Sequence, residues 1–177
     1  MSATVEIVET NGPLASAVNT ANPVNLNFGS ADVTGLVPAT YPVTAAANGA
    51  SYEKWIRLYV ASLGTSSNID NLKIWISDLG GGYVVGEGIN TNAVTSGYSA
   101  VSYPSGGPIE TRSTVAINVI PTSQPAGSNV GIAGALAGAI TAAPAYSDWI
   151  VLQDICTAST PAGPANQKTI TIQWDEQ

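Results

Sequence analysis

The sequence contains no histidine, and one of its 177 residues is a cysteine. Without histidine the chain lacks the commonest general base and the usual zinc ligand, and Ser-His and Cys-His nucleophile arrangements are excluded. The single cysteine, Cys156, cannot form an intrachain disulfide, so packing alone must hold the fold. It lies in an apolar run, where a buried thiol is the expected role. These absences predict a protein that is not an enzyme and binds no cofactor or metal.

Charged residues are also scarce. They make up 10% of the chain, against about 25% in typical globular proteins. The formal net charge of −7 argues against nucleic acid or an anionic membrane as a partner. The first ten residues lack the basic start and apolar core of a signal peptide, and the segment 130–143 is shorter than the roughly 20 residues of a membrane-spanning helix. We therefore expect no nucleic-acid partner and no membrane partner.

Helical periodicity and helix caps are missing too, whereas alternating apolar and polar residues recur along the chain. The closing run 168–175 alternates strictly, with Ile170, Ile172 and Trp174 on one face. Turn-forming residues separate the runs, and the pattern indicates roughly eight strands. The expected strands lie at 4–9, 23–28, 51–60, 69–77, 83–85, 113–120, 129–143, 146–156 and 168–175.

These strands predict an all-β fold, a single antiparallel β-sandwich of the immunoglobulin-like or jelly-roll kind. We expect residues 1–22 to form an extended N-terminal arm or a first edge strand, and residues 23–177 to form the sandwich. A connection rich in proline, glycine, serine and threonine joins the runs 146–156 and 168–175, which favours their pairing as a long-looped hairpin. The run 146–156 alternates less strictly, as is typical of a strand covered on both faces.

Two pairs of carboxylates could in principle support glycoside hydrolysis or calcium binding, Asp70 with Asp78 and Asp148 with Asp154. Neither pair has the dense acidic spacing of a calcium loop, and acidic residues at strand ends are usually solvated. The glycine-rich stretch 80–88 lacks the Lys-Ser/Thr pair of a phosphate-binding loop and indicates a break between strands.

Three aromatic residues offer a different kind of site. Trp55, Tyr59 and Trp75 fall on the face opposite the aliphatic stripe of two runs that we expect to be adjacent. Side by side they could form an exposed platform for sugar stacking or for a protein partner. The alternative is that they pack beneath a loop or a neighbouring subunit.

The segment 68–77, Asn-Ile-Asp-Asn-Leu-Lys-Ile-Trp-Ile-Ser, resembles a strand of small tailed-phage structural proteins written N-(I/L)-K-(V/I)-(W/Y)-(I/L)-S. The segments 121–134, 141–153 and 168–176 are similar to the same group. The resemblance therefore covers the chain from residue 68 onward, and its motifs are strand patterns rather than a catalytic signature. It implies a non-enzymatic virion protein and transfers no functional residue.

This resemblance implies a capsid decoration protein, also called an auxiliary or cement protein. Such a protein would bind the major capsid protein on the outer shell of the virion after synthesis in the host cytoplasm. The resemblance also implies a homo-oligomer, with a trimer favoured, and such symmetry would multiply weak contacts. The alternatives are a tail-fibre, head-fibre or adhesin domain of a virion, and a carbohydrate-binding module that uses the aromatic platform.

The contact surface is expected in the N-terminal arm and in the loop 31–49, which are poor in charge and long for connections. We expect deletion of residues 1–22 to abolish particle binding and leave a folded monomer. The candidate partner-binding residues are Val5, Ile7, Leu14, Val18, Val37 and Tyr41.

Overall fold

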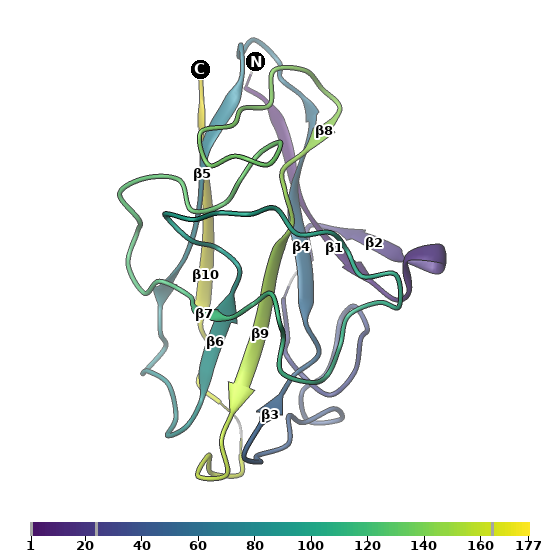
Figure 1. Ribbon diagram of the computed structural model, residues 1–177, viewed down its shortest axis with the longest axis vertical. Helices are drawn as coiled ribbons and strands as arrows, with labels where there is room; N and C mark the ends of the chain where they lie inside the picture. The colour runs from purple at the N-terminus through teal and green to yellow at the C-terminus, as the bar shows by residue number, and fades with distance from the viewer. Residues whose placement is uncertain (1, 24, 164) are drawn as a thin grey trace.

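A computed structural model describes residues 2–23, 25–163 and 165–177, and it confirms the all-β prediction (Figure 1). The described strands form two antiparallel sheets that enclose an apolar core, which is a β-sandwich. The larger sheet contains β1 (Thr4–Asn11), β2 (Val18–Ala21), β3 (Gly49–Ala50), β4 (Lys54–Ser62), β6 (Gly88–Thr91), β7 (Asn118–Val119), β8 (Ala145–Tyr146) and β9 (Ile150–Cys156). The smaller sheet pairs β5 (Ile69–Asp78) with β10 (Thr169–Glu176).

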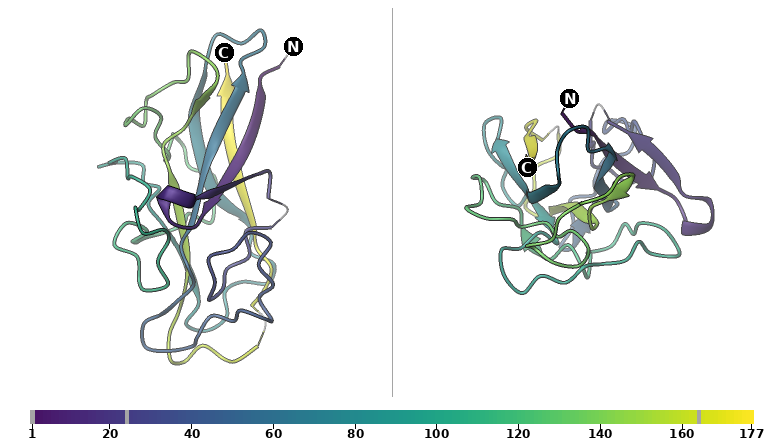
Figure 2. Two further views of the ribbon diagram at one scale, coloured as in Figure 1. Left: turned by 90° about the vertical axis from the view of Figure 1, so that its right-hand side faces the viewer. Right: turned by 90° about the horizontal axis from the view of Figure 1, so that it is seen from above.

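The larger sheet runs in the order β2-β1-β4-β9-β6-β7, with β3 paired to β9 and β8 paired to β4. A short 3₁₀ helix, η1 (Leu14–Ser16), joins β1 to β2. The smaller sheet lies across the core from the larger one, as the view from above shows (Figure 2). Each sheet therefore supplies one wall of the interior.

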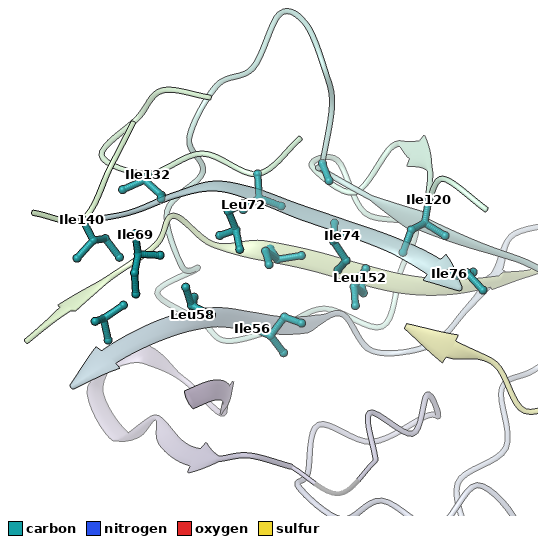
Figure 3. Close-up of a cluster of buried hydrophobic side chains, with 14 of the residues drawn as sticks. Ile56, Leu58, Ile69, Leu72, Ile74, Ile76, Ile120, Ile132, Ile140 and Leu152 are labelled. Atoms are coloured by element: carbon teal, nitrogen blue, oxygen red, sulfur yellow. The ribbon is translucent and has the colours of Figure 1, made fainter. Parts of the chain in front are cut away.

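The core between the sheets is built from strands with strict alternation. In β4, Ile56, Leu58 and Val60 are fully buried, as the period of two predicted. β5 faces them with its own aliphatic stripe, from Leu72 to Ile76 (Figure 3). Ile170, Ile172 and Trp174 of β10 pack against the same cluster and are partly buried. The predicted strands 51–60, 69–77 and 168–175 are therefore present, with their apolar faces turned to the core.

The outer face of the larger sheet is also covered. The irregular segment 92–117 crosses this face in front of β4 and β9 (Figure 1). Beneath it, Trp55 of β4 and Val151 of β9 pack with Tyr103 and Ala116 in a second apolar cluster. β9 is consequently buried on both faces, which explains why its sequence does not alternate cleanly.

The predicted C-terminal hairpin is wrong. β9 pairs with β4 and β6 in the larger sheet, whereas β10 pairs with β5 in the smaller one, with Ile170 opposite Ile76. The connection 157–168 crosses from one sheet to the other, so the two runs cover the core from opposite sides.

The N-terminal residues form part of the larger sheet rather than a separate arm. β1 pairs with β4 from Thr4 opposite Ser62 to Thr10 opposite Trp55, and β2 pairs with the other side of β1. β1 is thus an interior strand and β2 is the edge of the sheet. Deleting residues 1–22 would remove both strands, so it cannot be expected to leave a folded protein.

Several other expected strands are absent from the described residues. The segment 83–85 is irregular, 129–143 forms turns with isolated bridges that include Ile140 opposite Ile69, and 113–120 contributes only the short β7. In 23–28, Val24 lies outside the described residues, while Leu26 and Phe28 pack against the core without strand pairing. Small residues and glycines allow these segments to follow the surface of the sheets instead of extending them.

Irregular chain covers one edge of the smaller sheet. The side chain of Asn129 accepts a hydrogen bond from the Ile74 amide at 2.8 Å and donates one to the Ile74 carbonyl at 2.9 Å. The amide of Ile76 donates to the carbonyl of Pro121 at 2.8 Å. The outer edge of β5 is therefore satisfied by 121–140, whereas among the described residues β10 has β5 as its one strand partner.

Candidate binding surface

Four of the six candidate partner-binding residues are exposed apolar side chains. Leu14, Val18, Val37 and Tyr41 are between 40% and 60% exposed, on the β1–β2 connection, on β2 and on the loop 31–49. Val5 and Ile7 of β1 are partly buried against the core instead. Of the six predicted partner-binding residues, two therefore pack against the core and four are accessible to a partner.

The loop 31–49 is held in place by specific contacts. The Asp32 carboxylate accepts hydrogen bonds from the Asn11 side chain at 2.8 Å and from the Gly12 amide at 2.7 Å. The Ser30 amide donates to the carbonyl of Tyr41 at 3.0 Å, and Leu36 is buried beneath the loop. Because the loop is already ordered, a partner would lose little free energy in fixing it.

The prediction that Trp55 belongs to an exposed aromatic platform is wrong, because this residue is 2% exposed. Its ring packs edge-on against Tyr103, at a centroid distance of 5.4 Å, and against Trp149 at 6.0 Å. Its Nε1 donates a hydrogen bond to the Glu53 carboxylate at 2.9 Å. Trp55 therefore belongs to the covered outer face of the larger sheet, where a buried indole with a satisfied N–H is expected.

Tyr59 and Trp75 do not lie side by side. Tyr59 is on β4 in the larger sheet, where its ring lies 4.7 Å from that of Tyr146. Trp75 is on β5 in the smaller sheet, because the connection 63–68 crosses the core instead of forming a hairpin. The three aromatic residues therefore form no shared platform, and the carbohydrate-binding alternative loses the site on which it rested.

A groove opens between the two sheets where β1 faces β10. The two strands lie close together on one side of the molecule (Figure 2), and at one end the Ala3 amide donates to the Glu176 carboxylate at 3.1 Å. Away from this contact a cavity of about 990 Å³ opens, lined by β10 on one side and by Ile7 of β1 and the described residues of 22–28 on the other. Its apolar lining includes Ile7, Leu26, Phe28, Ile170, Ile172 and Trp174.

An ion pair links the two sheets at this groove. Lys168, just before β10, lies 2.6 Å from Glu87, just before β6, and both side chains are almost fully buried. Lys168 also lies over the ring of Tyr83, at 4.8 Å from its centroid. Both charges of this pair are therefore engaged with each other and are not free for a ligand.

Asp154 is the unpaired charge in the lining of the groove. Its side chain is 8% exposed, and its Oδ1 atom has no hydrogen-bond partner among the described residues. Burial, with a smaller contribution from the negative charge of Glu87, raises the pKa of Asp154 to about 7, against the opposing effects of Lys168, a backbone hydrogen bond from Ile155, and Arg112. Such a carboxyl can change its protonation near neutral pH and can accept a cation or a hydrogen-bond donor.

The position of Asp154 within its strand could have predicted that its carboxyl faces the core. Asp154 shares its strand parity with Ile150 and Leu152, which places its carboxyl on the core side of β9. Asp148, proposed as its partner in a carboxylate pair, instead accepts hydrogen bonds from the Tyr98 hydroxyl at 3.0 Å and the Gly134 amide at 2.9 Å. That role is structural.

The rest of the groove could not be read from the sequence, because its walls come from segments far apart in the chain. Within the part of the chain that the structure describes, no group of three or more acidic or cysteine side chains could hold a metal ion. No helix in that part has the length and apolar character to cross a membrane.

No family model, curated protein or solved structure matches this chain.

Proposed function

We propose that the chain is a non-enzymatic structural protein of a virion, which decorates the outer shell by binding the major capsid protein. It is made in the host cytoplasm and joins the particle as a homo-oligomer, with a trimer favoured. The resemblance of residues 68 onward to small tailed-phage structural proteins supports this proposal. The observation that carries it is the exposure of four large apolar side chains, Leu14 and Val18 on the β1–β2 hairpin and Val37 and Tyr41 on the loop 31–49, which are together called the exposed apolar surface.

This surface has the properties of a docking site for another protein. It combines large apolar side chains, which supply most of the free energy in protein interfaces, with a backbone that hydrogen bonds already fix. The chain as a whole is poor in charged residues, which lowers the average desolvation cost of burying its surface. A modest surface of this kind reaches useful affinity when symmetry repeats it on a shell.

The first experiment is to purify intact particles from the source and to quantify this chain against the major capsid protein. Decoration predicts a ratio near one or a simple fraction of one. A few copies in each particle would instead indicate a tail or fibre component, and absence from particles would overturn the proposal.

Point substitutions in the exposed apolar surface should weaken particle binding. We expect Leu14→Ser combined with Val18→Ser, and separately Val37→Ser combined with Tyr41→Ser, to lower affinity for undecorated shells at least about tenfold, because buried apolar anchors carry most interface energy. Affinity is measured by co-sedimentation with shells over a range of protein concentrations.

The matched control is Val85→Ser combined with Val119→Ser, since these valines are even more exposed but lie elsewhere on the molecule. Full binding by this control, with folded protein in all variants by circular dichroism, would support the assignment. If the control lost binding and the two test pairs kept it, the contact surface would lie beside β7 and the assignment would be wrong.

A further inference from the structure

We propose that the groove between β1 and β10 accepts an extended segment of a partner polypeptide, which adds as a strand to the free edge of β10 and places a lysine or arginine against Asp154. This site uses side chains other than the four of the exposed apolar surface, although Pro38, next to Val37, also lines the groove. It stands whether or not the chain decorates a capsid.

The free edge of β10 is the first observation. Among the described residues β10 pairs only with β5, and its outer edge adjoins the groove rather than another strand. Exposed edges are usually protected by proline, by lysine or by a covering segment. The sequence of β10, Thr-Ile-Thr-Ile-Gln-Trp-Asp-Glu, has no proline and no lysine. This edge therefore lacks the proline and lysine that usually prevent strand addition.

The shape of the groove is the second observation. Ile170, Ile172 and Trp174 follow one another at every second residue along β10, so the apolar wall repeats about every 6.6 Å. An extended peptide presents side chains at the same spacing. Ile7 and Phe28 line the groove as well and supply apolar contacts for side chains that enter it.

Asp154 is the third observation, and it defines the chemistry of the partner. Its buried Oδ1 atom has no hydrogen-bond partner among the described residues, while the neighbouring Glu87 and Lys168 pair with each other. A buried acceptor without a partner is costly, and a basic side chain from the ligand would satisfy it. The net charge of the chain, −7, also favours a basic partner.

A second copy of this chain does not fit that requirement. All five of its basic residues already have partners: Lys54 with Glu9, Arg57 with Tyr146, Lys73 with Ala126, Arg112 with Cys156 and Lys168 with Glu87. None is available on an extended segment to reach Asp154 in a neighbouring copy. The occupant is therefore a segment of a different protein.

The test uses synthetic peptides of about eight residues, the length of β10, in which valine and threonine alternate. Two probes carry a lysine in place of a valine, one near each end, so that either strand direction can place it beside Asp154. One comparison peptide has norleucine instead of lysine. Another carries N-methyl groups on alternate amides, which prevents strand pairing. Each is titrated to about 1 mM against the whole protein, with the NMR shifts of the backbone amides and of the Trp174 indole N–H as readouts.

We expect one lysine peptide to shift the amide signals of β10 and to bind about tenfold more tightly than the norleucine peptide, because a hydrogen bond to a charged group is gained. The N-methylated peptide should not bind. In Asp154→Asn the preference for lysine should disappear while binding of the norleucine peptide remains. The matched variant Glu110→Gln, which removes an exposed carboxylate, should keep the preference.

Three results would overturn the proposal: no binding by either lysine peptide, equal binding by the N-methylated peptide, or an unchanged lysine preference in Asp154→Asn. These outcomes are independent of particle binding. A native protein that binds the lysine peptide but no shell would refute capsid decoration alone, and one that binds shells but no peptide would refute the groove alone.

Discussion

Replacing Lys54 with methionine is expected to lower the free energy of unfolding by about 3–5 kcal/mol. The Lys54 ammonium lies 2.8 Å from the Glu9 carboxylate, and each side chain is 1% exposed. The substitution would leave the Glu9 charge buried without its cation. The other contact of that carboxylate is the Asn11 side chain at 3.3 Å, and Glu9 Oε2 has no hydrogen-bond partner among the described residues. Urea denaturation at neutral pH measures the loss.

Two further variants separate the ion pair from simple packing. Glu9→Gln combined with Lys54→Met removes both charges, so it should recover most of the stability lost in Lys54→Met. Lys73→Met is the matched lysine control, because Lys73 is also buried but donates its hydrogen bond to a neutral group, the Ala126 carbonyl, at 3.3 Å. Equal losses in Lys54→Met and Lys73→Met, with no recovery in the double variant, would contradict the expectation.

The second large effect is a loss of stability as the pH rises. The pKa of Asp154 is 3.8 in its ordinary state and about 7 in the fold, chiefly because of burial. Below about pH 4 both states hold the proton. Between about pH 4 and about pH 7 the unfolded chain releases it while the folded chain keeps it, so unfolding becomes more favourable. Above about pH 7 this contribution stays constant. Each tenfold change in proton affinity corresponds to about 1.4 kcal/mol, so above about pH 7 the ionisation of Asp154 lowers the free energy of unfolding by up to about 4 kcal/mol.

Denaturation in urea at about pH 5 and about pH 8 tests this expectation. In the native protein, Asp154 should lower the free energy of unfolding more at about pH 8 than at about pH 5. Asp154→Asn cannot ionise, so it should be more stable than the native protein at about pH 8 and should lose less stability between the two conditions. Glu110→Gln, at an exposed position, should follow the native protein. If the free energy of unfolding of Asp154→Asn decreased between the two pH values as much as that of the native protein, the raised pKa of Asp154 would not be the cause of the loss.

The strands with strict alternation were predictable, and their partners were not. The alternation in 51–60, 69–77 and 168–175 reports which side chains face the core, because the strand period is two. It does not report which strand lies alongside. The connections 63–68 and 157–168 are compatible both with a hairpin and with a crossing between sheets. Sequence alone favoured the hairpin after β9, and the structure has the crossing.

The candidate binding surface was predicted only in part, because alternation gives the face on which a side chain lies and not what covers that face. Leu14 and Val37 lie in segments without a strand partner on the core side, and the structure leaves them exposed. Trp55 was placed correctly on the outer face of β4, but the segment 92–117 covers that face and has no strand pattern of its own. A pattern of alternating residues cannot distinguish a solvated face from one covered by irregular chain. The groove depends on the packing of the two sheets, which no local pattern encodes.

The pairing of β10 with β5 has a consequence for synthesis. Ile170 lies opposite Ile76, and Leu152 of β9 lies opposite Lys54 of β4, so the central ladders join residues almost a hundred positions apart. Proteins dominated by such distant pairings fold slowly, over about milliseconds to seconds, because long loops must close first. On the ribosome, β4 and β5 emerge well before β9 and β10 exist to cover them. Nascent chains therefore carry unpaired strand edges and an incomplete core until the last strands are made, and such species are prone to aggregate.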